Sequence, residues 1–177
     1  MHKRLLATLI AAAAVVTLGV TDPGRATAIT PAGESGRDTT HRSTLRSTHA
    51  LLAALEEKDL QAISALTDQR ASLTNTLPLS GIREEAVTFE GKEQILGYIQ
   101  QVFTMMGDIA FSDVQVTVSA DGKTSFVQAN GDFTTADGRP YRNVYMFRYD
   151  WRDGRMVKAL EYANPVTFCK TFGLPDC

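Results

Sequence analysis

The sequence predicts an α+β domain in which helices come first and lie on one face of an antiparallel sheet that follows. Apolar residues recur at helical spacing in the segments 45–55 and 95–106. From residue 114 onward, runs of alternating apolar and polar residues are separated by Asp-Gly pairs, a pattern typical of β-hairpins. A chain of 177 residues is long enough to form one domain with its own core.

Residues 1–28 have the pattern of a secretory signal peptide. Basic Lys3 and Arg4 precede an uncharged apolar stretch, 5–20, and the Ala-Thr-Ala triplet at 26–28 suits a signal peptidase. The apolar stretch is shorter than the ~20 residues of a membrane span, although a retained membrane anchor is the alternative. We therefore expect cleavage near Ala28, a secreted, extracellular protein, and no association with the membrane afterwards.

Charge and histidine content narrow the partners of the predicted mature chain. The whole chain has 18 basic and 20 acidic residues, and cleavage would remove three basic residues and one acidic residue, leaving a net charge of −4. A mildly acidic protein is not expected to bind nucleic acid. Only His41 and His49 remain as histidines, so a metal site built on His and Cys is not expected.

Both cysteines, Cys169 and Cys177, lie at the C-terminus. In an oxidising compartment they can form a disulfide that closes the short loop 170–176, and two free thiols in a frayed tail are the alternative. Neither cysteine has a histidine near it in the sequence, which argues against a catalytic thiol.

The N-terminal half predicts a leader followed by three helices. Residues 29–42 are rich in Gly, Ser, Thr and Pro and are expected to be disordered, so that the domain itself spans 43–177. Asp59 is a candidate N-cap for a second, short helix. A β-prone piece at 71–77 and an irregular stretch at 78–90, a candidate cover for a pocket mouth, lead to the clearest helix, which begins at Gly91. The stripe positions are Leu45, His49, Leu52 and Leu55 in the first helix, Leu60, Ile63 and Leu66 in the second, and Ile95, Ile99, Val102, Phe103 and Met106 in the third.

The C-terminal half predicts four strands and a last short helix. The strands are expected at 114–118, 126–135, 141–151 and 156–162, and the helix at 165–172, with Gly173 as its stop. Side chains alternate across a strand, so the third strand has one nearly all-aromatic face. This face can be a core face under the helices. It can also be a pocket wall, because an asparagine and the tyrosine hydroxyls add polar tips to an apolar surface, and both can hold along one strand. Its members are Tyr141, Asn143, Tyr145, Phe147, Tyr149 and Trp151.

Turn length decides which residues share that aromatic face. A two-residue turn at the Asp-Gly pair 137–138 places the polar residues Gln128, Asn130 and Asp132 on it. Buried polar groups need partners, so this placement favours a pocket over a plain core. A slip of one residue in the register would turn all three side chains to solvent.

The next hairpin decides the direction of Glu161. A two-residue turn at the Asp-Gly pair 153–154 sets Glu161 beside Met146, on the outer face. A three-residue turn at 152–154, with the glycine in a bulge, sets Glu161 opposite Tyr145, and we favour it because Asp followed by Gly suits the bulged turn. A carboxylate in an apolar cavity has a raised pKa and can act as a general acid or base.

Several motifs of the C-terminal third together resemble those of a known family. They are Tyr141-Arg142-Asn143 with the aromatic positions after it, Asp153-Gly154, and Glu161-Tyr162-Ala163-Asn164-Pro165. They are similar to the SnoaL-like branch of the nuclear transport factor 2 superfamily, and most of all to the phenazine-biosynthesis A/B proteins. The resemblance covers about residues 43–174. It implies a cone-shaped fold, with a strongly curved sheet wrapped around helices, a pocket inside, and frequent homodimers through the sheet.

The resemblance also implies roles for single residues. Members of the branch include polyketide cyclases, ketosteroid isomerases, dehydratases, epoxide hydrolases and non-catalytic binders. Glu161 matches the pocket glutamate of the phenazine proteins, whereas their pocket histidine falls at Tyr98, so their condensation chemistry is not implied. Asp132 lies where the polyketide cyclases carry a catalytic Asp.

We therefore expect an exported enzyme of the cyclase, isomerase or dehydratase kind that binds a small apolar organic molecule without a cofactor. Glu161 or Asp132 would move a proton, and pocket side chains would orient the substrate or stabilise an oxyanion. These pocket side chains are Tyr98, Asn130, Asn143, Tyr145 and Phe147. A non-catalytic binding protein with the same pocket is the alternative, and a protein that binds a partner through its outer sheet face is the third hypothesis.

Overall fold

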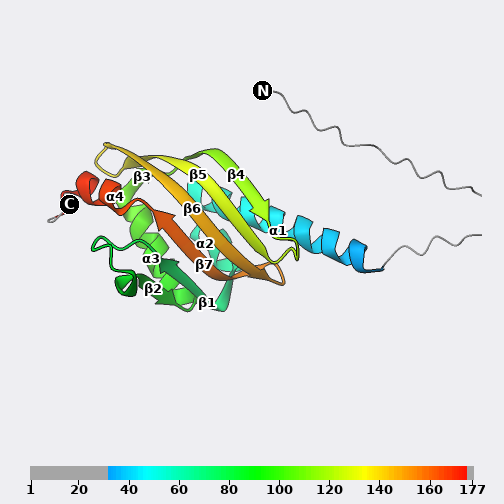
Figure 1. The fold of residues 1–177 in the computed structure, drawn as a ribbon. Coiled ribbons are helices and arrows are strands. Elements are labelled where there is room, and N and C mark those ends of the chain that lie inside the picture. Colours follow the sequence, from blue (N-terminus) through cyan, green and yellow to red (C-terminus); the bar gives the residue numbers. More distant parts are fainter. Residues whose placement is uncertain (1–31, 175–177) are drawn as a thin grey trace, which may run out of the picture. The chain divides into compact units, whose positions relative to one another are not determined.

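The computed structural model describes residues 32–174, with their side chains from residue 36 onward. This part of the chain contains four α-helices, one short 3-10 helix and the seven strands of one sheet (Figure 1). The strand order is β2-β1-β7-β6-β5-β3, and β4 also pairs with β5. The predicted α+β class is confirmed. The elements are α1 (Ala32–Glu56), α2 (Leu60–Leu66), β1 (Thr67–Asn75), η1 (Arg83–Glu85), β2 (Val87–Glu90), α3 (Lys92–Met105), β3 (Met106–Asp108), β4 (Phe111–Val118), β5 (Thr124–Thr135), β6 (Pro140–Arg152), β7 (Arg155–Ala163) and α4 (Pro165–Phe172).

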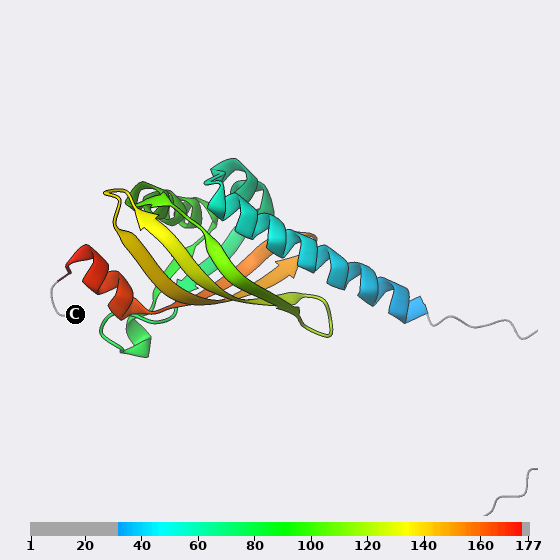
Figure 2. The same cartoon turned by 90° about the horizontal axis from the view of Figure 1, so that it is seen from above.

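Helices α1, α2 and α3 cover one face of the curved sheet, and α4 lies at one end of it (Figure 2). Ile63 of α2, Ile95 of α3 and Val127 of β5 are fully buried between these layers. Burial of one such side chain contributes ~1.5–3 kcal/mol. The predicted cap of α2 is confirmed, because Asp59 accepts a hydrogen bond of 2.9 Å from the backbone N–H of Ala62.

The direction of β1 differs from the predicted all-antiparallel sheet. The strands β4 to β7 form the expected antiparallel meander, but β1 pairs parallel with β7 and antiparallel with β2. Hairpin patterns predict the direction of neighbours joined by tight turns. They say nothing about β1 and β7, which have five strands between them in the sequence, and the parallel pairing of these two makes the sheet mixed.

Helix α1 begins earlier than the sequence predicts. Residues 32–42, which were expected to belong to a disordered leader, form its first turns. Within the helix, Arg42 pairs with Asp38 at 2.5 Å, and Thr44 donates to the backbone carbonyl of Gly122 in the β4–β5 turn. A Cβ on Gly122 would lie 2.8 Å from the backbone N of His41, so the glycine lets the helix pack closely on this turn. Local ion pairing and this contact support a helix that composition alone did not predict.

The buried stripe of α1 is partly polar. Thr48 is fully buried and donates a hydrogen bond of 2.7 Å to Ser125 on β5, which also accepts one of 2.9 Å from the Trp151 indole. His49, placed on the stripe by the sequence, is exposed. Buried hydroxyls with partners are tolerated in a core, and here they fix the position of α1 on the sheet.

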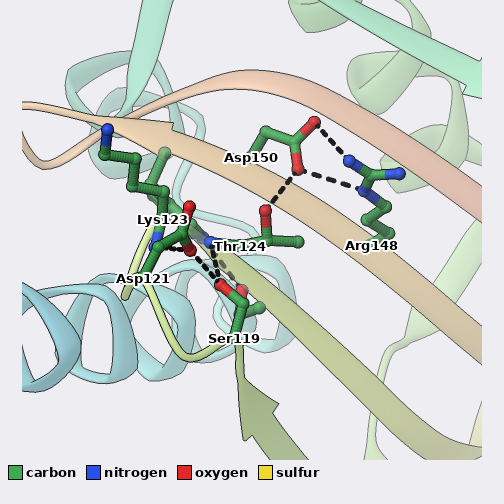
Figure 3. A network of polar contacts seen from close by, with 8 residues as sticks. Ser119, Asp121, Lys123, Thr124, Arg148 and Asp150 are labelled. Atoms are coloured by element: carbon green, nitrogen blue, oxygen red, sulfur yellow. Dashed lines mark hydrogen bonds and ion pairs between the residues drawn. The ribbon is translucent and has the colours of Figure 1, made fainter.

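A polar network runs from the turn between β4 and β5 to the outer face of β6 (Figure 3). Asp121 accepts a hydrogen bond of 2.6 Å from Ser119, which lowers the pKa of the Asp121 carboxyl. Thr124 donates to Asp150 at 2.9 Å, and Arg148 forms an ion pair of 3.1 Å with the same carboxylate. Of these contacts, the bond from Thr124 to Asp150 joins β5 to β6 and supports their register, while the ion pair with Arg148 holds the Asp150 carboxylate on the outer face.

The hairpin between β5 and β6 has a three-residue turn, which contradicts the two-residue turn predicted at 137–138. Thr134 pairs with Pro140, and the N–H of Thr135 donates to the carbonyl of Arg139. Residues 136–138 therefore form the turn. The cause lies in tertiary contacts: the N–H of Ala136 bonds the carbonyl of Met105 in α3, and Thr135 bonds Arg139 through its N–H and its hydroxyl. As a result the polar even-numbered residues of β5 face outward, as the one-residue slip predicts.

The hairpin between β6 and β7 is also different from the prediction. Arg152 pairs with Arg155, so the turn has two residues, and Asp153 and Gly154 have φ values of 51° and 73°, both positive as a type I′ turn requires. The register then shifts, because Trp151 pairs with Met156 whereas Asp150 pairs with Lys158, which leaves Val157 in a β-bulge. The bulge, rather than the turn, brings the following residues of β7 into phase with the aromatic face.

Candidate functional site

An apolar cavity of about 80 Å³ lies between the helices and the sheet. Its floor is the aromatic face of β6, whose odd-numbered residues are all buried, as the sequence predicts. The rings of Tyr145 and Phe147 stack at 5.2 Å, and those of Phe147 and Tyr149 at 5.6 Å. Gly131 on β5 leaves room for this wall, since a Cβ there would approach the Tyr145 ring to 2.5 Å. We call this space the inner cavity.

A wider groove of about 630 Å³ lies next to the inner cavity. It is lined by the segment between β1 and β2, by the second half of α3, and by the start of α4. Tyr98 and Val102 of α3 and Glu161 of β7 line both spaces. These three residues therefore mark the junction between the inner cavity and the groove.

Glu161 brings an ionisable group to this junction. It lies opposite Phe147 rather than opposite Tyr145, and it lines the inner cavity on the predicted side of the sheet. The residue keeps some exposure where it meets the groove, but protein surrounds its carboxyl group, and this burial raises the pKa of the carboxyl to about 7. The Tyr98 hydroxyl donates to Glu161 Oε2 at 3.2 Å, which offsets part of the rise.

Neighbouring elements hold Glu161 and Tyr98 in place. Thr76, just after β1, donates to the backbone carbonyl of Glu161 through its N–H at 2.9 Å and its hydroxyl at 2.7 Å. The Tyr98 ring stacks on Phe89 of β2 at a centroid distance of 4.5 Å. Burial and the nearby Glu161 charge raise the pKa of Tyr98 well above its ordinary value, so its hydroxyl keeps its proton and acts as a donor.

Asn143 has a different position from the one expected of a substrate-binding residue. Its amide donates to the Tyr141 hydroxyl at 2.7 Å and to the Asn164 carbonyl at 3.2 Å. Its carbonyl oxygen accepts from the N–H groups of Val144 at 2.8 Å and Asn164 at 3.1 Å. These bonds engage both ends of the side chain and attach the start of α4 to β6.

Tyr141 is a residue of the groove that the sequence reasoning did not single out. It lines the groove, is almost fully buried, and accepts the hydrogen bond from Asn143. Burial raises its pKa, and hydrogen bonds from Asn143 and Tyr145 offset part of that rise. Its place on the aromatic stripe of β6 was the available signal, since Tyr141 is the stripe residue nearest the start of the strand.

Asp132 and Asn130 lie on the outer face of β5 and line neither the inner cavity nor the groove. Asp132 forms an ion pair of 3.2 Å with Arg142 and accepts a hydrogen bond from Ser112. Asn130 donates to Asp113 at 2.8 Å. The prediction that these side chains face the pocket is wrong, because the three-residue turn before β6 moves the register by one residue.

Asn75, the last residue of β1, is a second groove residue that sequence reasoning missed, and it lies beside the junction. It pairs with Glu161 across the parallel β1–β7 contact and lines the groove. Its Oδ1 atom is buried, and among the described side chains it is the buried polar atom that lacks a hydrogen-bond partner. No local pattern pointed to it, because its position beside Glu161 depends on two strands that are distant in sequence.

The structure describes one of the two cysteines. Cys169 is buried in α4 and is not a free thiol, while Cys177 lies outside the described residues, so their pairing stays a prediction.

Within residues 32–174 no group of His, Cys, Asp and Glu side chains is arranged to hold a metal ion. In the same part of the chain, no helix is both long and apolar enough to cross a membrane.

Comparison with known proteins agrees with the motifs read from the sequence. The model of the SnoaL-like domain family matches residues 48–159. The protein YesE of Bacillus subtilis strain 168 is 29% identical over 123 residues, which cover 69% of this chain and 82% of YesE.

Solved structures that share the fold include the following two. A proposed isomerase from Bacillus subtilis has a TM-score of 0.67 at 25% identity and covers 76% of this chain and 96% of its own. A phenazine biosynthesis-related protein from Pseudomonas aeruginosa has a TM-score of 0.65 at 13% identity and covers 81% and 93%. The chain therefore belongs to the SnoaL-like domain family.

Proposed function

We propose that this protein is an exported enzyme of the isomerase, cyclase or dehydratase kind, which moves a proton on a small apolar molecule without a cofactor. The observation that carries the proposal is Glu161: a carboxyl group enclosed by protein beside an aromatic cavity, with a pKa of about 7. A group with a pKa near the working pH can both remove and return a proton. The fold shared with a proposed isomerase supports this class of reaction.

The geometry suits proton transfer next to a carbonyl group. Ionised Glu161 takes a proton from the carbon beside the carbonyl. The electron pair of that C–H bond forms a C=C bond, and the π pair of the carbonyl moves to the carbonyl oxygen to give an enolate. Tyr141 supplies a donor for that oxygen, because its own oxygen already accepts a hydrogen bond from Asn143 and its proton is left to donate. In a substrate with a C=C bond next to the deprotonated carbon, Glu161 then returns the proton to the far carbon of that bond while the carbonyl forms again. The double bond has then moved, and the enzyme is regenerated.

Exchange of deuterium into a ketone tests the proposal without knowledge of the natural substrate. We expect the protein to accelerate exchange of the α-protons of 1-(2-naphthyl)butan-1-one in D2O, followed by proton NMR. Loss of one general base typically costs ~100- to 10,000-fold, so Glu161→Gln should remove the acceleration. The rate should rise with pH and level off above about 7, as the carboxyl ionises.

Asp132→Asn is the matched control, because it makes the same change in a carboxyl group on the outer face. It should leave the exchange rate unchanged. Equal acceleration by the protein and by Glu161→Gln would refute the role of Glu161.

A non-catalytic binding protein is the second candidate, and the composition of the inner cavity favours it. Its lining holds one carboxyl group and no cationic side chain that would polarise a substrate. If the protein only binds its ligand, ketones should bind with equal affinity to the unmodified protein and to Glu161→Gln. Neither of the two should then accelerate deuterium exchange.

A further inference from the structure

The two spaces that meet at Glu161 differ greatly in size. The inner cavity measures about 80 Å³, whereas the groove measures about 630 Å³. An apolar cavity of ~150 Å³ is known to take up one benzene molecule, so the inner cavity holds a group of only ~3 to 5 carbon atoms. A molecule that reaches Glu161 with a larger body must leave that body in the groove.

The polar groups at the junction are not all satisfied. Tyr98 donates to Glu161, and the Asn75 amide interacts with the Tyr98 hydroxyl. This leaves the Asn75 carbonyl oxygen buried and without a partner in the described part of the chain. A buried acceptor without a partner carries a desolvation cost, and a donor on a bound molecule would remove it.

We propose that the site takes a two-part molecule with a hydrogen-bond donor between the parts. A short apolar head fills the inner cavity, a hydroxyl or N–H group donates to Asn75 at the junction, and a larger body lies in the groove. This inference rests on the proposed function only in using the same site. Three properties define the expected substrate class: the length of the head, the position of the donor and the size of the body.

The segment between β1 and β2 forms the wall of the groove that adjoins Asn75. It begins directly after Asn75, and its residues Leu77, Pro78 and Leu79 line the groove. Leu77 and Leu79 are about half exposed, so the segment presents an apolar surface to the body of the ligand. A ligand body in the groove therefore lies against this segment and next to Asn75, which lines the same groove.

A series of secondary alcohols tests the head length in the unmodified protein. The probes are 1-(2-naphthyl)alkan-1-ols whose alkyl heads grow from methyl to hexyl, measured by isothermal titration calorimetry. Affinity should rise about fourfold for each methylene up to propyl or butyl, as expected for burial of apolar surface. It should then fall at least tenfold by hexyl, because the inner cavity is full. A steady rise through hexyl would overturn the proposal.

Methyl ethers of the same alcohols test the donor. The protein should prefer each alcohol to its ether by about fivefold to tenfold, the range of one neutral hydrogen bond. Asn75→Leu keeps the volume of the side chain and removes the acceptor, so it should abolish the preference. Asn130→Leu makes the same change on the outer face and should keep it. An equal preference in Asn75→Leu and in the unmodified protein would contradict the role of Asn75.

The two proposals fail separately. The alcohols carry no acidic α-proton, so their binding does not depend on catalysis. If Glu161→Gln keeps the exchange activity while the length limit holds, the proposed function is wrong and the two-part site stands. If Glu161→Gln loses activity and the length limit is absent, the two-part site is wrong and the proposed function stands.

Discussion

At the scale of single residues, Glu161 is placed for chemistry at the expense of stability. Its carboxyl group has an ordinary pKa of 4.5 and a pKa of about 7 in the folded protein, because burial disfavours the charged form. A difference of this size corresponds to about 3 kcal/mol of unfavourable free energy when the group is ionised in the folded state. Strained or desolvated groups of this kind are typical of functional sites.

Glu161→Gln is therefore expected to stabilise the protein in a pH-dependent way. Below pH 4.5 the carboxyl is protonated in both states, and the two proteins should have similar free energies of unfolding. Between pH 4.5 and 7 the unfolded chain releases its proton while the folded protein retains it, so the folded protein loses stability relative to the variant. Above pH 7 the variant should be more stable by about 3 kcal/mol.

Urea denaturation at pH 4, 6 and 8 measures this difference. Asp132→Asn is the control, because Asp132 lies outside the cavity and pairs with Arg142. A stability difference for Glu161→Gln that does not change with pH would show that the carboxyl is not desolvated.

At the scale of elements, one side chain attaches α4 to the sheet. Asn143 bonds both the N–H and the carbonyl of Asn164, which is also the N-cap of α4. Pro165 and Phe168 at the start of this helix line the groove. Asn143 is therefore a positioning residue, and its effect on ligand binding passes through α4.

Asn143→Ala should destabilise the protein by ~1–3 kcal/mol, because the Asn164 N–H and the Tyr141 hydroxyl lose a buried partner. Hydrogen exchange of the α4 amides should become faster. Asn130→Ala is the control, because it makes the same change in an exposed side chain on the outer face of β5. Unchanged exchange in α4 together with weaker ligand binding would instead indicate direct contact between Asn143 and the ligand.

At the scale of the whole molecule, the outer face of the sheet carries apolar side chains that nothing in the described chain covers. Met146 and Tyr162 pair across β6 and β7 and are 40% and 37% exposed, and Val144 lies two residues along the same face of β6. Contiguous apolar surface of this kind is typical of protein interfaces. We propose that a second copy of the chain covers it, as the predicted homodimer requires.

Sedimentation velocity at high micromolar concentration tests this arrangement. The protein should sediment as a dimer, and Met146→Glu should shift it toward monomer, because a charge would be buried at the interface. Gln100→Glu adds the same charge on the exposed face of α3 and should leave the dimer intact. A monomer at all concentrations would contradict the proposal.

The order of the elements followed from the sequence because periodicity and turn residues act locally. The helical spacing of Ile95, Ile99 and Phe103 and the Asp-Gly turns predict α3 and the meander from β4 to β7. The motif at 161–165 indicated the SnoaL-like family, which the family model confirms. The aromatic stripe of β6 likewise predicted the floor of the inner cavity, because alternation along a strand does not depend on its neighbours.

The tertiary structure alone decided which polar residues reach that cavity. Ala136 bonds Met105 in α3, and this contact lengthens the turn and turns Asp132 outward. A bulge at Val157 turns Glu161 inward despite the two-residue turn before it, and a parallel strand pair brings Asn75 beside it. The physical reason is the period of two in a strand: one residue in a turn or bulge reverses every side chain that follows. The composition and pattern of the chain determine that a pocket exists, and contacts between distant segments determine what faces it.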